Sequence, residues 1–267
     1  MAADTHTPYP KRNDFLAFIA TLGLAFALSY IPVIHWPMQW METFFHEISH
    51  GLASILTGGR IVSIELNING SGWCRSVTNL RLFTTFSGYF GAVIWGGLIY
   101  VMADNASPKS ADRIAMLILG LIGMTMLLWA RDVVTWGILG IIAVPFIIIL
   151  KTKELVAEQV FMRFAGIYIL LNAIKSPLHL LRSETGGDAA TMQSLTLLPQ
   201  FIWVMIWVIL GVVTFILLFV RHIYTEKRAV SENEKNTVKT SAHKSLPEQS
   251  VLSRTEALLQ QIRQMKD

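Results

Sequence analysis

The residues His46, Glu47 and His50 have the types and the spacing of a metal-binding motif. They form the pattern His-Glu-x-x-His within an apolar stretch from Met41 to Gly58. Residues four positions apart lie on one face of a helix, so both imidazoles can reach the same ion. Zinc binds histidine nitrogens and lowers the pKa of a bound water to about 7. Glu47 would lie beside that water and could take its proton, so the pattern predicts zinc chemistry.

A catalytic zinc site needs a third protein ligand and one position left open for water. The chain has a single cysteine, Cys74, which excludes a cysteine-based zinc cluster and an intrachain disulfide. The third ligand should therefore be a histidine or a carboxylate. Asp188 is the preferred candidate because Gly186 and Gly187 form a flexible turn directly before it; its alternative role is that of a helix N-cap. The other candidates are His179, Glu184, Asp132 and Asp112.

The composition of the chain indicates that this site lies in a membrane. Hydrophobic residues make up 53% of the 267 residues and charged residues 15%, and the mean hydropathy is +0.49. A soluble domain usually carries about 25% charged residues. Ionisable residues are costly inside a bilayer and mark functional sites. Three of them in one apolar helix favour a metal site over a polar cluster that only hydrogen-bonds neighbouring helices.

Seven apolar segments predict an all-α polytopic membrane protein with about six to seven transmembrane helices. The segment that carries the motif is the shortest, so a re-entrant element is expected there, lining a cavity. Only Arg131 and Asp132 separate the fourth and fifth segments, which predicts a tight helical hairpin or one bent element. The seven segments are 15–34, 43–57, 83–102, 114–130, 133–150, 160–181 and 198–220.

A small β-hairpin over about 61–82 is predicted directly after the motif. Residues 61–67 alternate in polarity and are rich in β-branched side chains, and 69–72 have the composition of a turn. An open strand edge can hold a peptide in extended form by β-augmentation. We therefore expect Ile64, Leu66 and Asn69 to contact a substrate; the alternative is a plain connector.

The chain divides into three predicted parts. These are a polar N-terminus (1–14), a membrane-embedded domain (15–220), and a polar tail (221–267) with a short amphipathic helix at about 251–265. The formal net charge of +4 comes from basic residues in loops and in the tail, which is typical of topology signals and of contact with anionic lipids. The sequence has no nucleic-acid-binding motif, so the expected partners are the lipid bilayer and a membrane-protein substrate.

Several blocks of this sequence resemble a known family. The blocks are 45–53, 56–62, 69–72, 87–91 and 187–203. They are similar to the site-2 protease class of intramembrane zinc metalloproteases, and most similar to its bacterial site-2-protease-like branch. The resemblance implies one Zn²⁺ per chain held by His46, His50 and Asp188, with Glu47 as the general base. It also implies an integral multi-pass protein of the bacterial cytoplasmic membrane.

The sequence is compatible with two functions from different classes. The first is an intramembrane zinc metalloendopeptidase that hydrolyses peptide bonds of membrane-associated proteins, with a zinc-bound water activated by Glu47. The alternative is a non-proteolytic, zinc-binding membrane scaffold or binding protein of the same fold. An open coordination position with water would distinguish the enzyme from a closed structural site. A third hypothesis, a small transporter, predicts internal pseudo-symmetry, which the sequence does not show.

Overall fold

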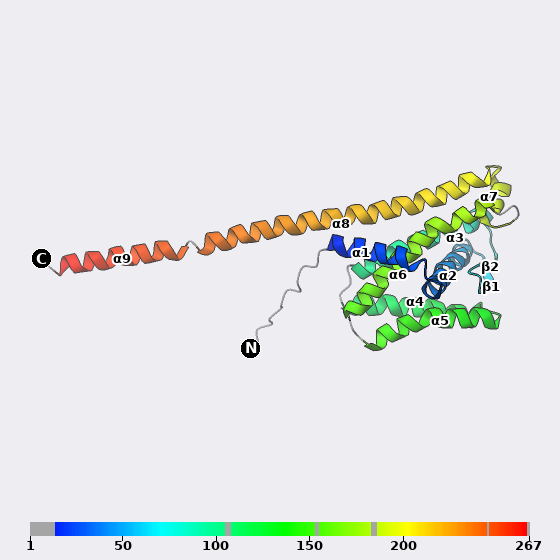
Figure 1. Ribbon diagram of the computed structural model, residues 1–267, viewed down its shortest axis with the longest axis horizontal. Helices are drawn as coiled ribbons and strands as arrows, with labels where there is room; N and C mark the ends of the chain where they lie inside the picture. Colours follow the sequence, from blue (N-terminus) through cyan, green and yellow to red (C-terminus); the bar gives the residue numbers. More distant parts are fainter. Residues whose placement is uncertain (1–13, 105–107, 153–154, 183–185, 245, 266–267) are drawn as a thin grey trace. The chain divides into compact units, whose positions relative to one another are not determined.

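The computed structural model describes residues 14–104, 108–152, 155–182, 186–244 and 246–265. The elements run along the chain as α1 (Asp14–Leu28), α2 (Pro32–Leu56), β1 (Arg60–Leu66), β2 (Gly72–Val77), α3 (Arg81–Asp104), α4 (Pro108–Leu128), α5 (Val133–Thr152), α6 (Leu155–His179), the 3-10 turn η1 (Leu180–Arg182), α7 (Asp188–Thr196), α8 (Gln200–Lys244) and α9 (Leu246–Gln264) (Figure 1). One compact unit comprises Leu16–Val220, and Arg221–Asp267 belongs to the other. The predicted metal-binding residues all lie in the unit Leu16–Val220.

Within the described ranges, four helices are long and apolar enough to cross a membrane. A further pair, α1 and α2, passes the same test together but is bent by 108°, as in a broken span or a re-entrant loop. The four are Arg81–Asp104, Val133–Lys151, Ala157–Arg182 and Gln200–Thr225. The structure thus supports a mostly helical protein with four to five candidate spans, instead of the six to seven transmembrane helices that the apolar segments predict.

The bend between α1 and α2 lies inside the apolar segment 15–34, which was expected to form one span. Ile31 has extended backbone angles (φ −100°, ψ 108°), and Pro32 opens α2. Proline disfavours a helical conformation at the residue before it and is well suited to the first turn of a helix. The segment therefore breaks here, and α2 runs for 25 residues with the motif in its second half.

The helix α2 lies among α3, α6 and the β-hairpin, while α4 and α5 run side by side as a helical hairpin (Figure 1). The two strands pair antiparallel, from Arg60 opposite Val77 to Leu66 opposite Gly72. A Cβ at Gly51 of α2 would collide with the side chain of Ile61. The lack of a side chain there allows the hairpin to pack directly on the motif helix.

The connection between α4 and α5 covers the outer edge of β1. The Ile64 amide donates to the Trp129 carbonyl (3.0 Å), and the Leu66 amide donates to Thr135 Oγ1 (2.8 Å). Asp132 caps α5 by accepting hydrogen bonds from the Thr135 amide (2.8 Å) and the Thr135 hydroxyl (2.6 Å). The same threonine thus links the start of α5 to β1.

The helices α3 and α6 approach each other closely through glycine. A Cβ at Gly96 would lie 2.8 Å from the Leu170 amide nitrogen, and one at Gly166 would lie 2.6 Å from the Tyr100 nitrogen. Ser87 of α3 also donates to the Ser49 carbonyl of α2 (3.1 Å). These contacts fix α3 against α2 and α6, and α3 supplies residues behind the predicted metal ligands.

Candidate metal centre

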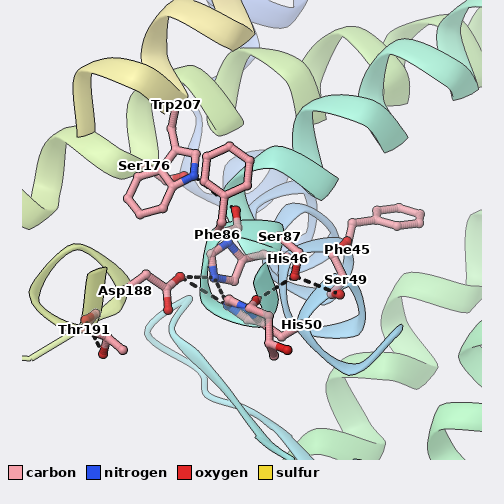
Figure 2. A network of polar contacts seen from close by, with 12 residues as sticks. Phe45, His46, Ser49, His50, Phe86, Ser87, Ser176, Asp188, Thr191 and Trp207 are labelled. Carbon is pink, nitrogen blue, oxygen red and sulfur yellow. Dashed lines mark hydrogen bonds and ion pairs between the residues drawn. The ribbon is translucent and has the colours of Figure 1, made fainter. Parts of the chain in front are cut away.

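Side chains from two helices meet at one point in the structure. His46 and His50 come from α2, and Asp188 comes from the first turn of α7 (Figure 2). Each imidazole Nε2 lies 3.1 Å from Asp188 Oδ2, and the two Nε2 atoms are 3.0 Å apart. All candidate ligand atoms lie within 4.8 Å of one another, so the group could hold a metal ion.

The donor atoms fit a zinc ion. Tetrahedral zinc with bonds of 2.0–2.1 Å to nitrogen and oxygen separates its ligand atoms by about 3.3 Å. The separations of 3.0 and 3.1 Å are close to this value. Two imidazoles and one carboxylate are also a donor set that leaves the fourth position open, as catalytic zinc sites do.

The ring of His50 is oriented from behind by α3. Its Nδ1 lies 2.6 Å from the Thr84 carbonyl oxygen, which can only accept, so Nδ1 donates and Nε2 is left for a metal. Gly88 makes this approach possible. A Cβ at that position would collide with His50 Nε2 and would lie 2.7 Å from His46 Cε1.

Glu47 lies beside the three candidate ligands and under β2. The residue is 5% exposed, and it interacts electrostatically with His46, His50 and Asp188. The carboxyl group accepts a hydrogen bond from the backbone amide of Cys74. A Cβ at Gly72 would lie 2.7 Å from Glu47 Cγ. The second strand of the hairpin therefore crosses directly over this carboxyl group.

Asp188 is placed by a turn that requires glycine. Gly186 and Gly187 have φ angles of +94° and +88°, which side-chain-bearing residues rarely adopt. The N-cap position of α7 is Gly187, and Asp188 is the first helical residue. The carboxyl group thus points at the histidines, and the alternative N-cap role is not the one that the structure shows.

The electrostatics of Asp188 favour its charged form. Burial alone would raise the pKa of this carboxyl group. The adjacent His50 and His46 imidazoles, through charge and hydrogen bonds, instead hold its pKa well below the usual range. An ionised carboxylate is the form that binds a cation.

The helix α7 is anchored by a small apolar cluster. Ala189 and Met192 of α7 are buried with Val204 and Trp207 of α8. The Trp207 indole donates to the Phe86 carbonyl of α3 (3.1 Å). Contacts with α3 and α8 therefore hold the third candidate ligand in place.

The remaining candidates for the third ligand lie elsewhere. Asp132 caps α5, and neither it, Asp112 nor His179 joins the metal-binding group among the described residues. Glu184 lies outside the described residues.

The three residues predicted to contact a substrate are already engaged in other contacts of the fold. Ile64 and Leu66 are fully buried in the core, and their amides are already bonded to the α4–α5 connection. The Asn69 side chain accepts hydrogen bonds from the Ser71 amide (3.1 Å) and hydroxyl (2.8 Å) within the turn. The edge of the hairpin that faces the metal centre belongs to β2.

Two neighbours of the site were not singled out from the sequence. The Thr84 carbonyl is a backbone group, so no side-chain pattern could have indicated it. The Tyr89 ring packs edge-on against His46 (ring centroids 4.3 Å apart, interplanar angle 73°). Tyr89 belongs to the block 87–91 that carries the family resemblance, but nothing in that block indicated that its ring packs against a candidate metal ligand.

The comparison with protein families defines the class of this protein. The sequence model of the family described as Peptidase M50B-like matches residues 19–218. The chain belongs to this family, which comprises site-2-protease-like intramembrane metalloproteases. The protein is thus of the zinc metallopeptidase class, and its candidate spans indicate an integral membrane protein. Searches of curated proteins and of solved structures gave no match.

The family match confirms the predicted resemblance and the predicted class of enzyme. The matched range contains His46, Glu47, His50, the hairpin and Asp188.

Proposed function

We propose that the protein is an intramembrane zinc endopeptidase that cleaves membrane-associated proteins, with one zinc per chain. The observation that carries the proposal is the meeting of Asp188 with both motif histidines. The aspartate lies 138 residues after His50, yet its carboxylate is within 3.1 Å of both imidazoles. Glu47 is buried directly beside this group.

His46, His50 and Asp188 would hold the ion. When bound, zinc supplies a Lewis acid that acidifies water and polarises a peptide carbonyl. Glu47 would take a proton from the attacking water and later give it to the leaving amine. The hydrogen bond from the Cys74 amide would hold the Glu47 carboxyl group in the orientation for both transfers.

The outer edge of β2 would hold the substrate. A helical peptide hides its carbonyls in i→i−4 hydrogen bonds, so it must unwind before it can be cleaved. A segment paired with a strand edge is extended, with its carbonyls accessible. Gly72 and Cys74 place this edge next to Glu47. This proposal replaces contact at Ile64, Leu66 and Asn69 with contact at β2.

The test measures the zinc content and the peptide-cleavage activity of the detergent-purified protein. We expect about one zinc per chain in the wild type and none in His46→Ala or Asp188→Ala. Asp132→Ala is the matched control, since it removes an aspartate outside the site and should leave zinc in place. Cleavage is measured with a library of quenched-fluorescence peptides of apolar sequence.

The variant Glu47→Gln separates the two functions that the sequence left open. For an endopeptidase, this variant keeps its zinc and loses cleavage. Full cleavage by Glu47→Gln would contradict the proposed mechanism. A zinc-loaded wild type that cleaves no member of the library, with Glu47→Gln indistinguishable from it, would favour the non-proteolytic scaffold.

A further inference from the structure

The strand β2 has one face that the proposed reaction does not use. Every second side chain of the strand is exposed, and these are Trp73, Arg75 and Val77. Successive residues of a strand point to opposite faces. The other set faces α2, where a Cβ at Gly72 would lie 2.7 Å from Glu47 Cγ. The three exposed side chains therefore form an outward face, on the side of the hairpin away from the metal centre.

A further strand can join this sheet only beside β2. Among the described residues, the sheet consists of β1 and β2, and the far edge of β1 is already bonded to Trp129 and Thr135. A strand edge is a template for pairing with another chain. An extended segment that pairs with β2 would place every second side chain next to the outward face.

Arg75 has little compensation for its charge within the hairpin. In the register of the two strands it lies opposite the uncharged Ser63. Its ion pair with Glu65 is long, with 3.6 Å between Arg75 Nη2 and Glu65 Oε1, and its side chain stays 69% exposed. A guanidinium group has five N–H donors in a fork that matches a carboxylate. Arg75 is therefore available to a second carboxylate from a neighbouring strand.

The residues on either side of Arg75 on this face are apolar. Trp73 is 62% exposed and Val77 is 50% exposed. Side chains directly opposite one another on paired strands interact, and favourable pairs include opposite charges and aromatic with β-branched residues. A segment paired with β2 thus meets an apolar, a basic and an apolar side chain at alternate positions.

We propose that the outward face selects substrates by an acidic residue flanked by apolar residues at alternate positions. The acidic side chain would pair with Arg75. Apolar side chains two positions before and two positions after it would pack against Trp73 and Val77. The inference rests on the proposed function, because it names the substrate class of the same site.

The acidic residue would lie close to the cleaved peptide bond. Gly72 lies over Glu47 and is three residues before Arg75. Three residues of a strand span about 10 Å. A segment paired along β2 therefore carries its acidic residue within about three residues of the bond that reaches Glu47.

The test uses the full-length, detergent-purified protein and quenched-fluorescence peptides of one apolar sequence. A single Asp is moved along this sequence, so all peptides of the series have the same net charge and general attraction to a basic protein cancels. We expect kcat/KM to be about fivefold higher when the Asp lies within three residues of the cleaved bond than when it lies farther away. Lys in place of Asp at the best position should abolish this gain.

Two variants assign the preference to Arg75. Arg75→Glu should reverse it, so that the peptide with Lys is cleaved faster than the peptide with Asp, and Arg75→Ala should remove it. The matched control is Arg131→Glu, which changes an exposed arginine of the α4–α5 connection, on the covered side of the hairpin. Arg131→Glu should keep the preference of the wild type. A merely structural role of Arg75 would slow the cleavage of all peptides equally and leave their ratio unchanged.

The outcomes separate this inference from the proposed function. A wild type that cleaves the whole series and the Lys peptide at equal rates would overturn the inference alone. An Asp preference that persists in Arg75→Glu would do the same. A wild type that cleaves no peptide of the series or of the wider apolar library would overturn the proposed function together with this inference.

Discussion

The position of Gly88 shows how much of the metal centre depends on a missing side chain. An added Cβ would collide with His50 Nε2 and crowd His46. We expect Gly88→Ala to fold but to lose its zinc, because either the rings or α3 must move away. Zinc content per chain measures this.

Gly120→Ala is the control for Gly88→Ala. A Cβ at Gly120 of α4 would meet nothing within 4 Å, so this variant should keep one zinc per chain. Equal zinc content in both variants would contradict the packing that we describe around the two histidines.

The motif residues and the aspartate were predictable to different degrees. The spacing of His46 and His50 on one helix face follows from helix geometry alone. The two glycines before Asp188 favoured it as the third ligand. The spacing of residues fitted a helix N-cap role equally well. Only the packing of α7 on α3 and α8 brings its carboxylate to the histidines. The Thr84 carbonyl, which orients His50, is a backbone group, so no pattern of side chains could predict it.

The β-hairpin was predictable as an element, whereas the edge that faces the candidate metal centre was not. Alternation and the turn at 69–72 indicate two strands, but they do not say which edge is covered. The α4–α5 connection is far away in sequence and bonds to Ile64 and Leu66. The edge near the metal centre is therefore that of β2.

A side chain at Gly72 would fill the space between β2 and Glu47. Its Cβ would lie 2.7 Å from Glu47 Cγ and 2.8 Å from Glu47 Oε1. We expect Gly72→Ala to keep its zinc but to cleave peptides about 100-fold more slowly, since small displacements of reacting groups have effects of this size. Rates with a cleavable library peptide measure it.

Gly123→Ala serves as the control for Gly72→Ala. A Cβ at Gly123 of α4 would meet nothing within 4 Å, so this variant should leave the cleavage rate unchanged. A normal rate in Gly72→Ala would place substrate binding elsewhere.

The cap of α5 predicts a pH-dependent contribution to stability. Burial alone would raise the pKa of Asp132, but hydrogen bonds from Thr135 and from backbone amides lower it. A lowered pKa in the folded state stabilises the protein at pH values above the unfolded value of about 3.9. The contribution is lost as the pH falls through the folded pKa.

We therefore expect Asp132→Ala to lower the stability by about 1 kcal/mol at pH 7, the usual cost of a lost N-cap. The difference from the wild type should shrink on acidification below about pH 4. Thermal unfolding at a series of pH values measures it. A difference that persists unchanged in acid would show that Asp132 acts through packing instead of through its charge.

Among the described residues, the structure supports four to five candidate spans, fewer than the six to seven that the apolar segments predict. The segments 15–34 and 43–57 count as two in the apolar pattern, whereas the structure joins them as one pair bent by 108°. In addition, α4, which contains most of the segment 114–130, is not among the candidate spans of the described residues. Hydropathy does not register a bend, although Pro32 was a local signal for it. The division of the chain at 14/15 and 220/221, and the bacterial membrane, stay predictions.

The metal would link distant parts of the molecule, so its removal should reduce stability. A bound ion stabilises the folded state by about 2.7 kcal/mol when its free concentration is 100 times its Kd. We expect a chelator to lower the thermal midpoint of the wild type. Asp188→Ala already lacks the link, so chelation should leave its midpoint unchanged; an equal shift in both proteins would contradict the proposed ligand set.

The order of these parts along the chain has a consequence during synthesis. The ribosome makes the motif helix early, and the third candidate ligand only after α6 is complete. A nascent chain that has inserted α1–α6 would hold two of the three ligands and could not retain the metal. The enzyme would therefore stay inactive until its own insertion is nearly finished, and unfolded neighbours in the same membrane would be spared from premature cleavage.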